Sequence, residues 1–366
     1  MNKIDSRIEQ SSISQDNNTW FNFMPVFSVL LGLLMSGLMM LLLGYNPLIV
    51  YTNMLSYAFR DIYNIADIFA KATPLILTGL AFGFAFRASL FNIGAQGQFY
   101  IGAVMAVACA LKLGSLPSYL TLIICFIMSL IGGSLWAAFI GYVKARFNEF
   151  LVSMMLTYVA IAIMNFLLVG LLKESKGEYP QTDVIPKNGW LPSLIPHTRL
   201  HWGFVLALLI ALLAYIILWR TSLGYKIRMV GFNRDAARYA GINVENIFVI
   251  VFFISGAFAG IAGFTEVNGM QHMLIEGFNP IIGAEGIGIA ILGNAHPLGI
   301  VLSALLFGAL KVGGNLVLQT SRIPASIIGI TEGLVILSVI LSYYIRDKLI
   351  ILRSKKKLAV QERHRL

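Results

Sequence analysis

Runs of about 20 apolar residues recur along the whole chain, and they restrict its fold more than any other feature. A helix of about that length crosses the hydrocarbon core of a bilayer. The composition agrees, since 58% of the residues are hydrophobic and only 12% are charged, which excludes an ordinary soluble domain. No segment alternates like a barrel strand, and a helix satisfies its own backbone polar groups in lipid. The sequence therefore predicts an all-α polytopic membrane protein.

The apolar runs predict about ten transmembrane helices within a membrane domain over residues 23–345. A polar tail (1–22) precedes this domain and a basic tail (346–366) follows it. The first run is too long for a signal-peptide core, so we interpret it as a retained span. Five helices fall in each half, about 23–172 and 202–345, and an odd number gives the halves opposite topology. The predicted spans are 24–43, 70–87, 91–111, 119–143, 150–172, 202–219, 247–268, 279–293, 297–316 and 325–345.

Lysine and arginine are distributed unequally between the two sides of the predicted membrane. With the N-terminus in the cytoplasm, 18 of the 27 fall on the inner side, mostly in the loop 220–246 and the C-terminal tail. The positive-inside rule favours this orientation, with both termini cytoplasmic. These loops, together with anionic lipid, account for the net charge of +10, so we expect no nucleic acid partner.

Two glycine-rich segments repeat each other. Each follows a Phe-Asn pair, and they read Gly-Ala-Gln-Gly at 94–97 and Gly-Ala-Glu-Gly at 283–286. Two further pairs match in the same order, and three matches favour a duplication where one would be weak. We predict an inverted five-plus-five repeat with interrupted helices, as in transport proteins. The further pairs are Gly79-x-x-x-Gly83 with Gly256-x-x-x-Gly260, and Gly141-x-x-Lys144 with Gly308-x-x-Lys311.

Four polar residues near these glycines, Asn92, Gln96, Gln98 and Glu285, are candidates for lining a substrate pathway. Amides can form hydrogen bonds to a polar substrate without the desolvation cost of a charge. A second role stays open for the amides, namely hydrogen bonds that hold helices together. A carboxylate at membrane depth is by default a functional hypothesis, although Glu285 could also cap a helix N-terminus.

Two segments on the predicted outer side each have a residue pattern that predicts their local structure. Residues 47–71 place apolar and polar side chains on opposite helical faces, which predicts an amphipathic helix on the outer surface. Residues 173–201 contain four prolines and predict an ordered loop. This loop either receives an external partner or simply connects two spans.

The longest inner loop, residues 220–246, contains a short predicted helix. Asn233 is suited to be the N-cap of this helix, and Asp235–Tyr239 form its body. Gly241 is suited to end it. A helix of two turns is marginal alone in water, so we interpret it as a docking helix. We expect Ala237 to lie in the docking surface.

Catalytic and nucleotide-binding motifs are missing from the sequence. It contains no G-x-x-x-x-G-K-[ST], H-E-x-x-H or G-x-S-x-G pattern and no Cys/His cluster. Cys109 and Cys125 both lie in apolar runs. We therefore expect no enzyme, no metal and no cofactor bound by this chain.

Three stretches resemble permease subunits of ATP-binding-cassette importers for nucleosides and simple sugars. They read FRASLFNIGAQGQFYIGA (86–103), GFNRDAARYAGI (231–242) and GAEGIGIAILGNAHPLG (283–299). The similarity extends from about Pro47 to Tyr344, and the outer amphipathic segment resembles the nucleoside branch. The family usually has a carboxylate where this chain has Gln96, so only the second repeat keeps its acid.

The resemblance implies a multi-pass importer subunit in a bacterial cell membrane, translocating nucleosides, purine nucleosides first, with a ribose-like sugar as the alternative. ATP and Mg would be used by a separate ATPase subunit with two nucleotide-binding domains. A second related permease and an extracytoplasmic lipoprotein of the basic-membrane-protein type would complete the complex. The implied ATPase-coupling helix comprises Gly231, Asn233, Ala236, Ala237, Gly241 and Ile242.

An alternative from another class is an ion-coupled secondary transporter with Glu285 as its proton or sodium site, because such carriers also contain inverted five-span repeats. The two functions differ in the segment 231–242, which a self-sufficient carrier has no reason to keep.

Overall fold

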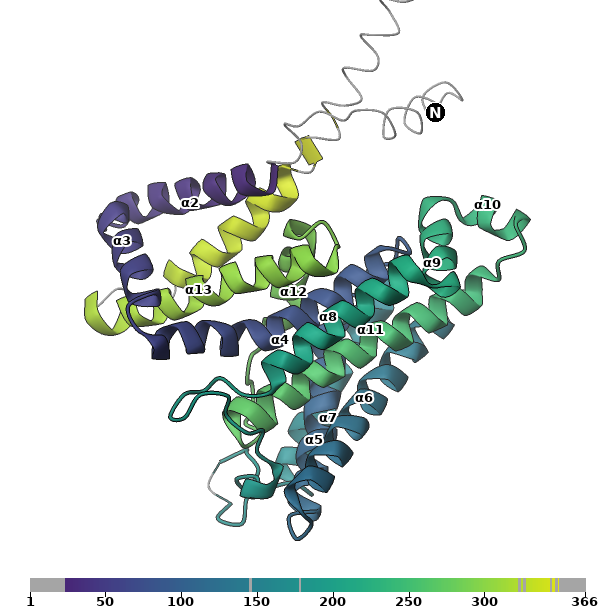
Figure 1. Ribbon diagram of the computed structural model, residues 1–366, viewed down its shortest axis with the longest axis horizontal. Helices are drawn as coiled ribbons and strands as arrows, with labels where there is room; N and C mark the ends of the chain where they lie inside the picture. The colour runs from purple at the N-terminus through teal and green to yellow at the C-terminus, as the bar shows by residue number, and fades with distance from the viewer. Residues whose placement is uncertain are drawn as a thin grey trace, which may run out of the picture. The chain divides into compact units, whose positions relative to one another are not determined.

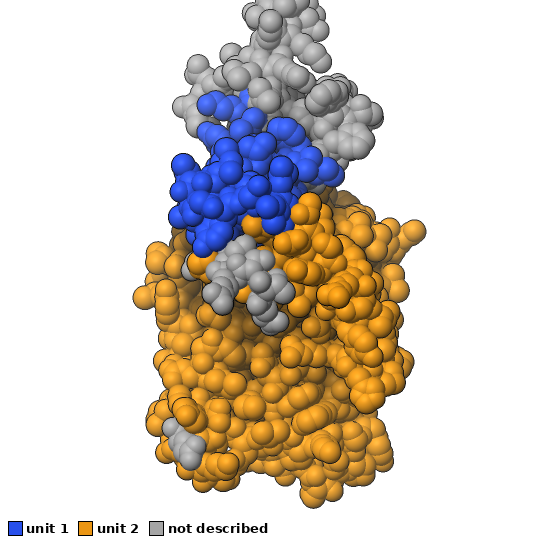
Figure 2. All heavy atoms as spheres, turned by 90° about the vertical axis from the view of Figure 1, so that its left-hand side faces the viewer, with its two compact units in different colours: residues 1–49, 325–366 blue, residues 50–324 orange. Residues whose placement is uncertain are grey.

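The structure is a computed structural model that describes residues 24–144, 147–177, 179–321, 324, 327–342, 344–345 and 348. The chain divides into two compact units, which are described separately: residues 1–49 with 325–366, and residues 50–324 (Figure 2). The predicted N-terminal tail lies outside the described residues, and so does the predicted C-terminal tail apart from Lys348.

The described residues are mainly helical and form no β-strand beyond isolated bridges, which confirms the predicted fold class (Figure 1). The elements are α2 (Met24–Leu42), α3 (Pro47–Ala58), α4 (Ile62–Phe86), α5 (Ala95–Lys112), α6 (Ser118–Val143), α7 (Glu149–Val169), η2 (Lys187–Gly189), α8 (Gly203–Arg220), α9 (Ser222–Phe232), α10 (Arg234–Tyr239), α11 (Val244–Glu266), the π-helical η3 (Val267–Gln271), α12 (Ile282–Leu292), α13 (Pro297–Ser321) and a helix over Ile327–Ser342.

A helix lies at each of the ten predicted membrane positions. Within the described part of the chain, α4, α6, α7, α8, α11 with η3, and α13 are long and apolar enough to cross a bilayer. α2, α12 and the helix Ile327–Ser342 are shorter apolar helices. α5 is more polar because Gln96 and Gln98 lie in its first turn.

The predicted single amphipathic helix over residues 47–71 is wrong. α3 ends at Ala58, and α4 begins at Ile62 after Asp61, whose side chain accepts a hydrogen bond from the backbone of Asn64 at 2.8 Å. This N-cap starts a new helix, so the second part of the segment belongs to α4. The apolar face of α3 is buried as expected, at Val50, Met54 and Ala58.

α4 and α11 form the core of the unit 50–324 and pack against each other. α11 also packs on α5 and α6, and α4 packs on α12 and α13. Glycines allow these approaches, since a Cβ at Gly256 or Gly260 would collide with the α6 backbone at Gly133 or Ser129. Because α4 and α11 occupy matching positions in the predicted repeat, the same contacts recur with the halves exchanged. This pattern agrees with the predicted duplication.

The helices α5 and α12 begin inside the bundle. Residues 87–94 before α5 are not helical, and α12 has only 11 residues, a length of about 16 Å and roughly half of a membrane span. Their N-terminal ends meet, because the backbone N–H of Gly283 donates to Gln96 Oε1 at 2.6 Å. The predicted interrupted helices are present, and the two repeated glycine-rich segments touch.

The other unit joins the first and tenth predicted spans. The hydroxyl groups of Ser36 on α2 and Thr331 lie 2.6 Å apart, and Gly32 faces the backbone of Val335. Small side chains and paired hydroxyls thus hold these two helices together within their own unit.

Candidate functional site

Two of the predicted pathway amides, Asn92 and Gln98, form a closed and fully buried cluster. Asn92 Nδ2 donates to Gln98 Oε1 at 2.9 Å, and Gln98 Nε2 donates to Asn92 Oδ1 at 2.8 Å. Asn92 Nδ2 also donates to Ser255 Oγ on α11 at 2.6 Å, and Ser255 Oγ donates to the Ala81 carbonyl on α4. These bonds connect the start of α5 to both core helices, so the geometry supports the helix-packing role for both amides.

Gln96 joins the two repeats. Its Oε1 accepts from Gly283, one of the first N–H groups of α12, and its Nε2 donates to the Asn279 carbonyl at 3.0 Å. The first N–H groups of a helix have no partner within the helix, and Gln96 supplies one. A carboxylate could accept from Gly283 but could not donate to Asn279. The structure therefore gives a physical reason for an amide at position 96.

Glu285 forms an ion pair that the sequence reasoning missed. Its Oε1 lies 2.6 Å from Lys311 Nζ on α13, with side-chain exposures of 4% for Glu285 and 25% for Lys311. Glu285 also lies in the first turn of α12, where the helix dipole favours an anion. The only available signal was the repeat pattern itself, which singled out Lys311 without showing its partner.

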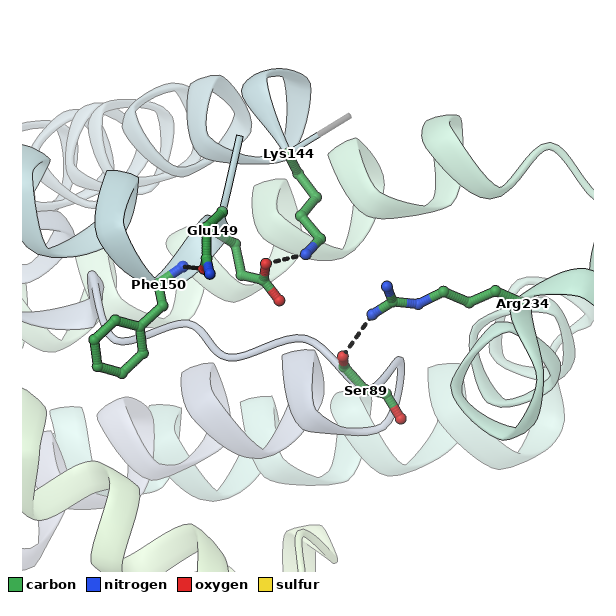
Figure 3. A network of polar contacts seen from close by, with 6 residues as sticks. Ser89, Lys144, Glu149, Phe150 and Arg234 are labelled. Carbon is green, nitrogen blue, oxygen red and sulfur yellow. Dashed lines mark hydrogen bonds and ion pairs between the residues drawn. The ribbon is translucent and has the colours of Figure 1, made fainter. Parts of the chain in front are cut away.

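The matching lysine of the first half, Lys144, also has a carboxylate partner. Lys144 at the end of α6 pairs with Glu149 in the first turn of α7 (Figure 3). Figure 3 shows this pair close to Arg234, which begins α10, and to Ser89, which precedes α5. Both halves of the repeat therefore pair their Gly-x-x-Lys lysine with the first turn of a helix.

The short helix predicted within residues 220–246 is confirmed as α10. Asn233 Oδ1 accepts from the N–H groups of Asp235 and Ala236, both at 3.0 Å, and Gly241 has the positive φ of +78° that suits a C-terminal stop. Ile242 N–H donates back to the Ala237 carbonyl at 3.0 Å. The N-cap and the stop are at the predicted residues.

The placement of Ala237 in a docking surface is wrong. Ala237 is fully buried against its own chain, and Gly231 packs so closely on the Arg87 carbonyl that a Cβ there would collide. The outward side carries large exposed apolar residues instead, with Phe232 84% and Tyr239 94% exposed. Asn233, Ala236 and Gly241 are exposed as well, and Ile242 is half-buried.

The loop 173–201 is held by hydrogen bonds to η3 and to the segment after it. Asn268 Nδ2 donates to the Gly189 carbonyl at 2.7 Å, and the Ile185 N–H donates to the His272 carbonyl at 2.8 Å. The Trp190 ring stacks on His272, with the ring centres 3.8 Å apart. The loop therefore covers the segment that leads into α12.

A buried histidine lies at the end of this loop. His201 Nδ1 accepts from the Gly203 N–H at 3.1 Å, and Nε2 is buried without a hydrogen-bond partner. Burial, with a smaller effect from neighbouring His272, lowers the pKa of His201 to about 4. The imidazole is therefore neutral at physiological pH.

Metal ligands are not clustered in the described part of the chain. There, no three His, Cys, Asp or Glu side chains are placed to hold a metal ion.

Comparison with known proteins identifies relatives over most of the chain. The family model described as the permease component of branched-chain amino acid transport systems matches residues 64–343. The guanosine ABC transporter permease protein NupP of Bacillus subtilis is 34% identical, covering 88% of this chain and 94% of the relative. The glucose ABC transporter permease protein TsgB13 of Haloferax volcanii is 32% identical, covering 88% of both chains. A second guanosine permease protein of B. subtilis, NupQ, is 29% identical over 72% of this chain and 88% of its own length.

Proposed function

Because this chain belongs to the permease family of branched-chain amino acid transport systems, in its nucleoside-type ABC transporter group, we propose that it imports a purine nucleoside into the bacterial cytoplasm. It forms the membrane passage, and a separate subunit hydrolyses ATP with Mg. A nucleoside is favoured over glucose because two of the relatives, NupP and NupQ, are guanosine transporter permeases, although TsgB13 is a glucose permease.

The observation that carries this proposal is the geometry of α10. The helix is capped at both ends and packs on its own chain through Ala237, while Phe232 and Tyr239 beside it are exposed. Exposed aromatic residues beside a short capped helix suit insertion into a groove of a partner. We assign that groove to the ATPase subunit, so that Gly231–Ile242 is the coupling segment.

The remaining partners follow from the same proposal. NupP and NupQ are two different guanosine permease proteins of one strain, and both resemble this chain, which supports a second related permease as its partner. An extracytoplasmic lipoprotein would deliver the nucleoside to the side of the loop 173–201. Both termini would lie in the cytoplasm.

The ion pair of Glu285 supports an importer over an ion-coupled carrier. A carboxylate that serves as a proton or sodium site must exchange its cation during each cycle, whereas Glu285 is paired at 2.6 Å with a covalently attached lysine. We propose that Glu285 and Gln96 hold the facing ends of α12 and α5 beside the passage. Asn92 and Gln98 then support the start of α5 from behind.

The test is uptake into proteoliposomes that contain this chain with the ATPase, the second permease and the lipoprotein. We expect uptake of labelled guanosine that requires ATP and is not displaced by excess glucose or ribose. Vesicles that contain this chain alone serve as the control. Ion-driven uptake in those vesicles would contradict the importer, and displacement by a sugar would contradict the nucleoside.

A further inference from the structure

Residues Arg87–Ser89, directly after α4, are attached to the inner loop at three points. Ser89 Oγ donates to the Gly231 carbonyl at 2.8 Å. Arg234 Nη2 donates to the Ser89 carbonyl at 3.0 Å (Figure 3). The third point is the close packing of Gly231 on the Arg87 carbonyl. The start of α10 therefore cannot shift without moving this segment or breaking these contacts.

Ser89 also has an unusual backbone. Its φ of +52° lies in the left-handed region, which serine rarely adopts because its Cβ meets the backbone. Such strain persists only where the surroundings impose it, and it is concentrated at switch regions. Here the imposed contacts are those to Gly231 and Arg234. Ser89 is followed within three residues by Asn92, whose amide cluster fixes the start of α5.

The Arg87 side chain extends the connection to the second half of the repeat. Its Nε donates to the Ala295 carbonyl at 2.9 Å and its Nη2 to the Asn294 carbonyl at 2.7 Å. Asn294 and Ala295 form the turn after α12, and both have positive φ, of 53° and 47°. A guanidinium is also favourable at the C-terminal end of a helix. Arg87 thus stabilises a strained turn between α12 and α13.

We propose that residues 87–89 are the transmission element that passes a movement of the α9–α10 segment to both interrupted helices. Ser89 acts on α5 and Arg87 acts on α12, so both are positioning residues. This inference rests on the proposed docking of α10 to the ATPase subunit. It explains why the coupling segment is attached to the connection between α4 and α5 instead of to a peripheral loop.

The experiment measures guanosine transported per ATP hydrolysed in the reconstituted full complex. Ser89→Ala removes the hydroxyl and keeps the strain, Ser89→Gly removes both, and Arg234→Gln removes the bond to the Ser89 carbonyl. We expect the ratio to fall about fivefold or more in each, and most in Ser89→Gly, while ATPase activity and yield of the complex stay constant. Arg87→Lys keeps the charge but cannot donate to the Asn294 and Ala295 carbonyls with two fixed N–H groups, so it should also lower the amount of guanosine transported per ATP.

Lys226→Gln is the matched control, because Lys226 is exposed on α9 in the same basic loop. It should leave the ratio unchanged. An unchanged ratio in Ser89→Gly and Arg234→Gln would overturn the proposal. Loss of the ATPase subunit from these variants, with the unmodified complex intact, would also overturn it, since the segment would then serve docking. If the unmodified chain fails to bind the ATPase subunit, the proposed function itself is wrong.

Discussion

Breaking the ion pair between Glu285 and Lys311 on one side only should destabilise the unit 50–324 strongly. Lys311→Met leaves a carboxylate that is only 4% exposed without its cation, whereas Glu285→Gln leaves an ammonium that is a quarter exposed. At 2.6 Å and an effective dielectric constant near 20, the attraction is roughly 6 kcal/mol before desolvation is subtracted. Removing one partner of a buried pair costs about 3–5 kcal/mol, and the partial exposure of Lys311 favours the lower value.

We therefore expect Lys311→Met to lower the free energy of unfolding by about 3 kcal/mol. Glu285→Gln should cost about 1 kcal/mol, because the amide oxygen still accepts from the lysine. The double variant Glu285→Gln/Lys311→Met should be more stable than Lys311→Met alone, since no charge is left buried. This order of stability distinguishes an unpaired charge from a simple loss of packing.

The assay is denaturant unfolding of the purified protein in detergent, with Lys112→Met at the exposed end of α5 as the control. Guanosine uptake by Glu285→Gln in the full complex is measured beside it, and should stay ATP-dependent and unaltered from about pH 5 to 8. A Lys311→Met variant as stable as the unmodified protein would refute the reasoning. Uptake that an ion gradient drives in the unmodified protein, and that Glu285→Gln abolishes, would indicate the carrier instead.

Three further predictions concern other parts of the chain. Ala237→Asp should unfold the α10 segment because the residue is fully buried, whereas Tyr239→Asp should leave the fold intact and weaken binding of the ATPase subunit, as measured by co-purification. Asn92→Ala should cost about 1–3 kcal/mol of stability in denaturant, because it leaves the buried Gln98 amide unpaired, and Gln98→Ala should cost a similar amount. The pKa of His201, about 4, lies below its ordinary value of 6.5. Between these two pH values the native state therefore binds fewer protons than the unfolded state. This group should then contribute a loss of about 3 kcal/mol of stability as the pH falls from about 6.5 to 4, and His201→Gln should make the stability curve shallower by that amount.

Much of the fold could be predicted because its signals are local. Apolar length placed a helix at each predicted span, and the capping residues Asn233 and Gly241 placed α10 to within a residue. The repeated Gly-Ala-Gln-Gly and Gly-Ala-Glu-Gly segments predicted that two interrupted helices belong together. The prediction of one helix over residues 47–71 was wrong because the amphipathic pattern continues from α3 into α4. The N-cap at Asp61 separates the two helices.

Only the tertiary structure decided which of these groups meet. Gln96 bonds to Gly283 across 187 positions, Ser89 to Gly231 across 142, and Glu285 pairs with Lys311 on the next helix. Helical periodicity sets which side chains share a face, but the crossing of one helix on another sets the partner of each face. For the same reason Ala237 proved to be buried: six residues of helix do not show which side lies against the rest of the chain.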